Sequence, residues 1–126
     1  MKIHIIPVRP HPKETARKGK NGNMYTPTKT RQYEAYVGLC ANKWFKRPMM
    51  GKVKLFSRFY FTSDDGRGDL SNLVKSLEDG MNGIAYIDDK QIAAHDNAIV
   101  IVECKCGEEC ECTCERTEFG LESYKG

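Results

Sequence analysis

The chain has 126 residues, a length that suits one domain with a single core of moderate size. Its apolar fraction of 40% is below the usual globular average, 29% of its residues are charged, and its net charge at pH 7 is +3. No segment has the length and apolarity of a signal peptide or a membrane-spanning helix, so we expect a cytoplasmic protein with no membrane contact. Its cysteines are then expected to be reduced or bound to metal.

The first third of the chain is basic. Residues 1–8 alternate weakly as a strand, and three prolines then favour an extended path. Residues 16–24 are rich in Gly and Lys and predict a flexible loop within a basic segment, 9–27. A basic arm beside acidic segments suits a protein that binds phosphates, whereas the plain alternative is a solvated loop.

The central part predicts a helix followed by a strand. Thr26 is placed to cap a helix with Pro27 as its first residue, and apolar residues at helical spacing extend that helix from about Thr28 to Phe45. Residues 52–62 alternate, with both faces partly apolar, which indicates a central strand.

A polar turn over 63–68 leads into a second helix capped by Asp69. Its expected buried stripe consists of Leu70, Leu73, Val74, Leu77 and Met81. The opposite, polar face carries Asn72, Lys75 and Asp79, and the helix is expected to end at Gly80 and Gly83.

The C-terminal third predicts strands. A short extended piece at Tyr86 delivers Asp88 and Asp89, and residues 98–104 and 110–119 are expected to pair as a hairpin. His95 lies six residues after Asp89, close enough to approach the acidic site, but we expect it at a strand entry. The element order is β-α-β-α-β-β, which predicts one α+β domain over 1–126 with a mixed sheet.

Two acidic segments therefore flank a helix that carries a lysine. Carboxylates in such an arrangement would bind a hard divalent cation, which phosphodiester hydrolysis usually requires. With a basic remainder that fits a polyanionic substrate, the pattern indicates a metal-dependent nuclease. Each residue alone has a simpler structural role: Asp69 as a helix cap, Lys75 as a solvated side chain, and 88–89 as a turn.

The stretch from Asp69 to Lys75, Asp-Leu-Ser-Asn-Leu-Val-Lys, and the later Tyr86-Ile-Asp-Asp-Lys-Gln-Ile92 resemble the RusA family of Holliday junction resolvases. That family's signature is approximately D-x-D-N-x-x-K, a glycine, and aromatic-x-D-D-x-Q-[IV]. The segment Tyr25-Thr-Pro27 is also similar, and the resemblance covers most of the chain from Ile3 to Val102. It implies a homodimeric, magnesium-dependent endonuclease, common in phages and prophages, that cuts four-way DNA junctions by paired symmetric nicks.

By this resemblance, Asp69 and Asp89 match catalytic carboxylates, Lys75 matches the functional lysine, and Asn72 matches the motif asparagine. Asp69, Asp88 and Asp89 are then the expected ligands of Mg²⁺, with Mn²⁺ as a substitute. Asp69 and Asp89 would hold the cation against the scissile phosphate, and Lys75 would stabilise the transition state or the leaving oxygen. The residues expected to contact branched DNA are Lys13, Arg17, Lys18, Lys20, Lys29, Arg31 and Asn72.

Ser71 departs from the family pattern, which has a second aspartate there. Its loss removes one negative charge from the expected metal site, for which Asp88 or Asp79 would have to compensate. The alternative is a junction-binding protein with weak or no cleavage.

Five of the six cysteines crowd into residues 104–114, outside the resemblance. On a hairpin, Cys104 and Cys106 share one face of their strand, and Cys110, Cys112 and Cys114 share one face of the next. If the register matches these faces, four thiolates, expected to be Cys104, Cys106, Cys110 and Cys112, would bind Zn²⁺ or a soft metal. The alternatives are a sheet face lined with small buried thiols, or a protein whose function is zinc binding at this cluster.

Overall fold

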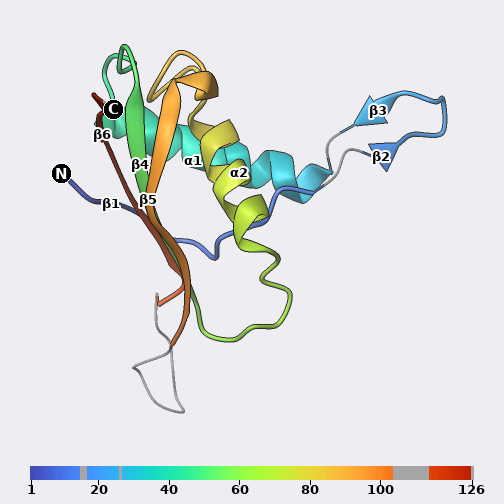
Figure 1. The fold of residues 1–126 in the computed structure, drawn as a ribbon. Coiled ribbons are helices and arrows are strands. Elements are labelled where there is room, and N and C mark those ends of the chain that lie inside the picture. The colour runs from blue at the N-terminus through green and yellow to red at the C-terminus, as the bar shows by residue number, and fades with distance from the viewer. Residues whose placement is uncertain (15–16, 26, 104–113, 126) are drawn as a thin grey trace.

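The computed structural model describes residues 1–14, 17–25, 27–103 and 114–125. Its elements are β1 (His4–Ile6), β2 (Arg17–Lys18), β3 (Met24–Tyr25), α1 (Thr28–Trp44), β4 (Val53–Phe61), α2 (Leu70–Met81), the 3₁₀ helix η1 (Asp89–Gln91), β5 (Ile92–Val102) and β6 (Arg116–Ser123). The main sheet has the order β1-β6-β4-β5, and both helices lie over the same face of it (Figure 1). The predicted α+β class with a mixed sheet is confirmed. Within the described residues, no helix is long and apolar enough to cross a membrane.

Strand β4 is the centre of the sheet, as its sequence predicted. It pairs in parallel with β5 and antiparallel with β6, and both of its faces are largely covered. Val53, Leu55 and Phe59 are fully buried in the core beneath the helices. A strand whose two faces are both covered can carry apolar residues at nearly every position. This explains why apolar and polar residues alternate imperfectly along β4.

The expected hairpin of residues 98–104 with 110–119 is wrong. β5 and β6 lie on opposite sides of β4, so they do not pair with each other. β5 begins at Ile92, directly after η1, and runs parallel to β4 because α2 carries the chain back across the sheet. Strand β4, whose side chains are mostly buried, is the apolar partner that both strands share.

Helix α1 begins and ends within one residue of its predicted bounds, but its N-cap residue is not the expected one. Pro27 is the N-cap residue and makes no side-chain capping bond, while Thr26 lies outside the described residues. Asp69 occupies the N-cap position of α2 as predicted, yet its carboxylate makes no capping bond either.

Helix α2 buries most of its predicted stripe and ends at Met81, between the two glycines that were expected to terminate it. Leu73, Val74, Leu77 and Met81 are buried, and Gly80 lies inside the helix rather than after it. A Cβ on Gly80 would come within 2.7 Å of the Val37 side chain of α1. Glycine therefore allows the two helices to approach each other closely, which is why it does not act as a terminator here.

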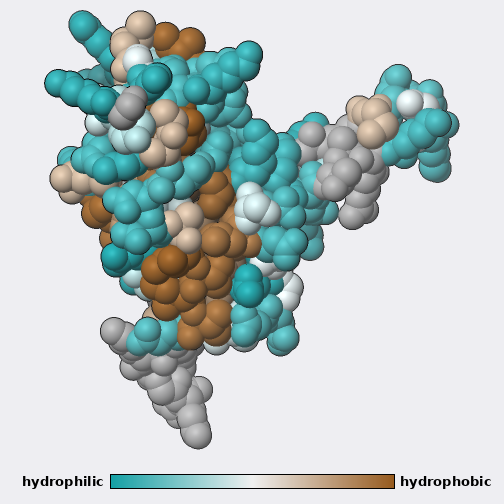
Figure 2. All heavy atoms as spheres, viewed as in Figure 1, coloured by the Kyte–Doolittle hydropathy of each residue, from teal (hydrophilic) through white to brown (hydrophobic). Residues whose placement is uncertain are grey.

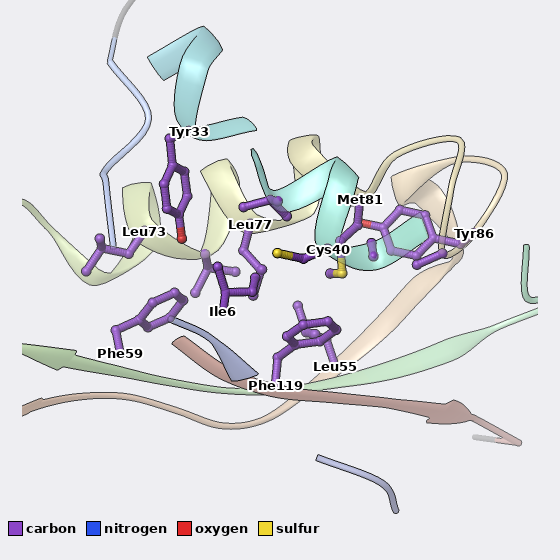
Figure 3. Packing of buried hydrophobic residues seen from close by; sticks show 14 of the residues in the cluster. Ile6, Tyr33, Cys40, Leu55, Phe59, Leu73, Leu77, Met81, Tyr86 and Phe119 are labelled. Atoms are coloured by element: carbon purple, nitrogen blue, oxygen red, sulfur yellow. The ribbon is translucent and has the colours of Figure 1, made fainter. Parts of the chain in front are cut away.

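The core fills the space between the helices and the sheet (Figure 3). Tyr33 and Leu77 from the helices meet Ile6, Leu55 and Phe119 from the strands. The Tyr33 hydroxyl lies 3.3 Å from the Thr117 hydroxyl, so the polar tip of this buried ring has a partner.

The loop expected over residues 16–24 contains a small hairpin instead. β2 pairs antiparallel with β3 through Arg17 with Tyr25 and Lys18 with Met24. Gly22, at φ +85°, lies in the connection between these strands. The hairpin projects away from the body of the molecule, beyond the N-terminus of α1 (Figure 1).

Candidate functional site

Lys75 connects helix α2 to the acidic turn that follows it. It projects from α2, and its ammonium nitrogen lies 3.2 Å from a carboxylate oxygen of Asp89, the first residue of η1. The same nitrogen lies 3.1 Å from Asp79, one turn further along α2. The helix and the turn that the sequence analysis singled out separately therefore meet at one lysine.

The turn that carries Asp89 is held by a reciprocal cap. An oxygen of Asp88 accepts a hydrogen bond from the Lys90 backbone N–H at 3.1 Å, and the Gln91 side chain accepts from the Asp88 backbone N–H at 3.0 Å. The Gln91 amide also donates to the carbonyl of Met49 at 2.8 Å and to that of Gly51 at 2.9 Å. This explains the spacing of Asp88 and Gln91 as a capping box. Asp88 helps to position Asp89.

The N-terminal arm reaches the same site. The Lys13 ammonium lies 2.6 Å from Glu34 of α1 and 3.1 Å from Asp79, and its backbone N–H donates to the Asn72 carbonyl at 2.8 Å. A chain of alternating charges thus runs from Glu34 through Lys13, Asp79 and Lys75 to Asp89. Lys13 is used within this chain, so it differs from the exposed lysines of the arm.

The arm also passes close over the start of α2. A Cβ on Gly68, which has φ +76°, would lie 2.5 Å from the Pro12 ring. The hydroxyl of Ser76 donates to the backbone carbonyl of His11 at 2.5 Å. These contacts hold the arm, and with it Lys13, against the helix that carries the motif residues.

The electrostatic effects follow from these contacts. Hydrogen bonding with Asp88, and then with Lys75, holds the pKa of Asp89 below its usual value. Hydrogen bonds with Asp79 and Asp89 raise the pKa of Lys75. Burial opposes the charge of Lys13, but its hydrogen bonds with Glu34 and Asp79 outweigh that effect and raise its pKa. At neutral pH an ionised Asp89 therefore lies beside the charged ammonium group of Lys75.

The remaining motif residues lie on the exposed start of α2. Asp69, Ser71 and Asn72 are all exposed. Ser71 and Lys75, one helical turn apart, line the same open cavity of about 380 Å³. The position where the signature has a second aspartate therefore faces the same space as the lysine.

The comparison with known families decides the affiliation. The family model described as endodeoxyribonuclease RusA matches residues 7–99, a range that includes α2, η1 and every motif residue named above. The chain belongs to the RusA family. It is an endodeoxyribonuclease of the kind that resolves Holliday junctions, which implies binding to branched DNA. No match was found among curated proteins.

RusA nucleases generally depend on a divalent metal, and the donors present here fit such an ion. The carboxylates of Asp69, Asp88 and Asp89 are hard oxygen ligands. Among the described residues, no group of three or more His, Cys, Asp or Glu side chains forms a ready metal cage. Magnesium does not need one, because it is usually held by one or two carboxylates together with water and substrate phosphates.

The basic residues predicted to contact DNA divide into two sets. Lys18 and Lys20 of the β2–β3 segment and Lys29 and Arg31 of the first turn of α1 are exposed. Lys13 forms the second set, because it pairs with Glu34 and Asp79. The Arg17 side chain lies outside the described part of the chain. The exposed set lies at the end of α1 from which the hairpin projects (Figure 1).

The expected zinc ligands Cys104, Cys106, Cys110 and Cys112 lie outside the described residues. The strands that flank them, β5 and β6, are separated by β4 in the sheet. The face-sharing argument for these cysteines assumed a hairpin of β5 with β6, so that argument no longer supports a zinc site.

The sequence analysis missed Glu78 at the site, and it preferred a strand-entry role for its partner His95. His95 lies on β5, and its Nε2 is 3.3 Å from the Glu78 carboxylate of α2. Both residues line the cavity with Ser71 and Lys75. A signal was present: Glu78 lies one helical turn after Lys75 and two turns after Ser71, so the three share one side of the helix. His95 belongs to the site and does not serve only as a strand entry.

Proposed function

We propose that this RusA-family nuclease is a Mg²⁺-dependent homodimer that resolves four-way DNA junctions by paired, symmetric nicks. The observation that supports this most directly is the contact between Lys75 and Asp89, since it unites both halves of the motif. Asp69 and Asp89 would hold the cation, with Asp88 beside them, and Mn²⁺ would substitute for Mg²⁺. When bound, the cation would neutralise charge that develops on the phosphate.

Lys75 is the residue of the chain best placed to act on the phosphate itself. Its side chain is about half exposed, and it is held between Asp79 and Asp89. A fixed cation beside the scissile group would stabilise negative charge in the transition state without first having to reorganise. Asp79 would keep the ammonium in place, because Asp79 is itself held by Lys13.

The exposed basic residues would bind the arms of the junction. Lys18, Lys20, Lys29 and Arg31 form a cationic end of the molecule, and Asn72 is exposed at the start of α2. Phosphate contacts of this kind supply affinity that does not depend on sequence and falls with salt. They suit a nuclease that reads DNA shape.

Symmetric cutting of a four-way junction requires two sites related by a two-fold axis. Strand β5 offers an edge for this, because within the described residues it pairs only with β4. Ile99 and Val102 on β5 are 39% and 42% exposed. Apolar surface also gathers where β5 meets the start of α2 (Figure 2). Pairing of two β5 edges would extend the sheet and leave the helices of both subunits on the same side.

Cleavage of a synthetic four-way junction in the presence of Mg²⁺ tests the proposal. Asp69→Asn and Asp89→Asn should each abolish nicking while junction binding in chelator is kept or strengthened, because the loss of a carboxylate also removes repulsion from phosphate. Glu122→Gln is a suitable control, since Glu122 pairs with Lys54 away from the site. Equal loss of binding and cleavage in folded Asp69 and Asp89 variants would contradict the assignment.

A second candidate is a junction-binding protein with weak cleavage, which the serine at position 71 favours. The same assay separates the two: tight binding in chelator with no nicking in Mg²⁺ or Mn²⁺ would support binding alone. If zinc binding at the cysteines were the function, the protein would instead contain stoichiometric zinc, and Asp69→Asn would leave that function unchanged.

A further inference from the structure

The cavity beside Lys75 has an unusual combination of walls. Leu70, Val74 and Ala98 make part of it apolar, while Ser71, Lys75, Glu78 and His95 supply polar groups. Its volume of about 380 Å³ leaves room for water beside the position at which a scissile phosphate would meet Lys75. The proposed function uses Lys75 and the aspartates, but it assigns nothing to Glu78 or His95.

Glu78 is held in place by contacts with two other segments of the chain. It lies on α2, its carboxylate is 3.3 Å from His95 of β5, and its backbone carbonyl accepts a 2.6 Å hydrogen bond from the Tyr86 hydroxyl. Tyr86 is itself fully buried. The Glu78 side chain is only 15% exposed, whereas that of His95 is 41% exposed. The carboxylate is therefore positioned at the cavity wall, and the imidazole links it to solvent.

We propose that Glu78 is a catalytic residue of this chain, which accepts the proton of the attacking water, and that His95 positions its carboxylate. This rests on the proposed nuclease function. Ser71, where the family signature has a carboxylate, lines the same cavity two helical turns before Glu78.

The chemical step is a hydrolysis. An O–H bond of the water breaks and its proton goes to a Glu78 oxygen, while the water oxygen forms a new bond to phosphorus. The bond from phosphorus to the departing deoxyribose oxygen breaks, and that oxygen takes a proton from solvent water. Glu78 then returns its proton to solvent by way of the exposed His95 ring.

The environment of Glu78 suits a base near neutral pH. Burial raises its pKa to about 7, with Lys75 acting in the opposite direction and Asp89 and Asp79 adding to the rise. The other titratable groups that face it are His95 and the hydroxyl of Tyr86. A general base works best when its pKa is close to the working pH.

The main test is the single-turnover rate of junction nicking with Mg²⁺. Glu78→Gln should lower this rate by about 10²-fold or more, with junction binding in chelator unchanged, because a general base typically contributes a factor of that size. The wild-type rate should rise with pH as Glu78 loses its proton, and Glu78→Gln should lose that rise. Glu78→Asp, which keeps a carboxylate, should lose less rate, and Glu122→Gln should behave like the wild type.

His95 is tested by its conservative replacement. His95→Gln keeps an N–H donor for Glu78 and should retain most of the rate with a shifted pH profile, whereas His95→Phe should lose roughly as much as Glu78→Asp. A readout without metal or DNA is the ¹³C signal of the Glu78 carboxyl, identified by its absence from Glu78→Gln. It should titrate near pH 7 in the wild type and move in His95→Gln.

The outcomes separate this inference from the proposed function. If Asp69→Asn and Asp89→Asn lose cleavage while Glu78→Gln keeps it, the nuclease assignment stands and the role of Glu78 is wrong. A variant that needs more Mg²⁺ but keeps the wild-type pH profile would make Glu78 a metal ligand, which also overturns the inference. A Glu78 carboxyl that titrates near the ordinary value of 4.5 would do the same. A wild-type protein without any cleavage would overturn both.

Discussion

Lys75 and Asp89 lie 3.2 Å apart, and their contact connects α2 to η1 across fourteen residues of sequence. Neither side chain is deeply buried, so the pair contributes little to stability by itself, typically about 0.2–1 kcal/mol for an exposed pair. Its importance lies in placing an ammonium group between Asp79 and Asp89. Asp79 holds the ammonium from the other side, and Lys13 holds Asp79.

The two lysines of this chain of charges are expected to differ in effect. Lys75→Met should reduce nicking by about 10²-fold or more, as the loss of a preorganised transition-state contact does, with little change in stability. Lys13→Met leaves Glu34 and Asp79 without their shared ammonium in a less exposed place, so it should destabilise the fold more. Urea unfolding and single-turnover nicking of both variants check this. Equal effects of the two variants on the nicking rate would argue against a special role for Lys75.

Ser71→Asp should raise the nicking rate or lower the Mg²⁺ concentration required. The substitution restores a carboxylate that the family signature contains, at an exposed position on the wall of the cavity. A magnesium titration of the rate measures the effect, with Ser63→Asp in the exposed turn before α2 as a control for added negative charge. An unchanged magnesium dependence in a folded Ser71→Asp variant would place residue 71 outside the metal site.

The stability of the protein should fall between about pH 5 and pH 8 through Glu78. Its pKa in the folded protein, about 7, lies above the ordinary value of 4.5, so the folded state binds more protons than the unfolded state in this window. The stabilising contribution is complete below the lower value and is lost as pH rises through the upper one. Thermal melts across this range should show a smaller decrease for Glu78→Gln than for the wild type. Parallel curves for the two proteins would show that Glu78 titrates normally.

Neutralising Lys18, Lys20, Lys29 and Arg31 together should weaken junction binding and flatten its salt dependence. Each lost phosphate contact should reduce the slope of log K against log salt by roughly one. A double neutralisation of Lys46 and Arg47, which are exposed beyond the other end of α1, is the control. If the control reduces the slope and the fourfold variant does not, the DNA follows a different path.

The protein should sediment without DNA as a dimer of about twice 14.3 kDa. Val102→Asp on the exposed edge of β5 should shift it towards the monomer, because a charge would then be placed in the expected sheet extension. Mixed dimers of wild-type and Asp89→Asn subunits should nick one strand and resolve junctions poorly. A monomer that makes both cuts at the normal rate would contradict the paired-site mechanism.

The sequence by itself determined the features that depend on local spacing. The apolar period set the extent of α1 and the buried stripe of α2. The distance from Asp88 to Gln91 is that of a capping box, and the motif residues identified the family that the comparison then confirmed. These features involve residues within a few positions of each other, for which backbone geometry alone decides which side chains meet.

Only the tertiary structure decided which distant segments meet. It placed β5 and β6 on either side of β4, whose mostly buried side chains make it the apolar centre of the sheet. It brought Lys13 to Asp79 and His95 to Glu78. These residues are too far apart in the sequence for helix or strand periodicity to predict their contacts. It also allowed helix α2 to include Gly80, because close packing against Val37 outweighs the weak helix propensity of glycine.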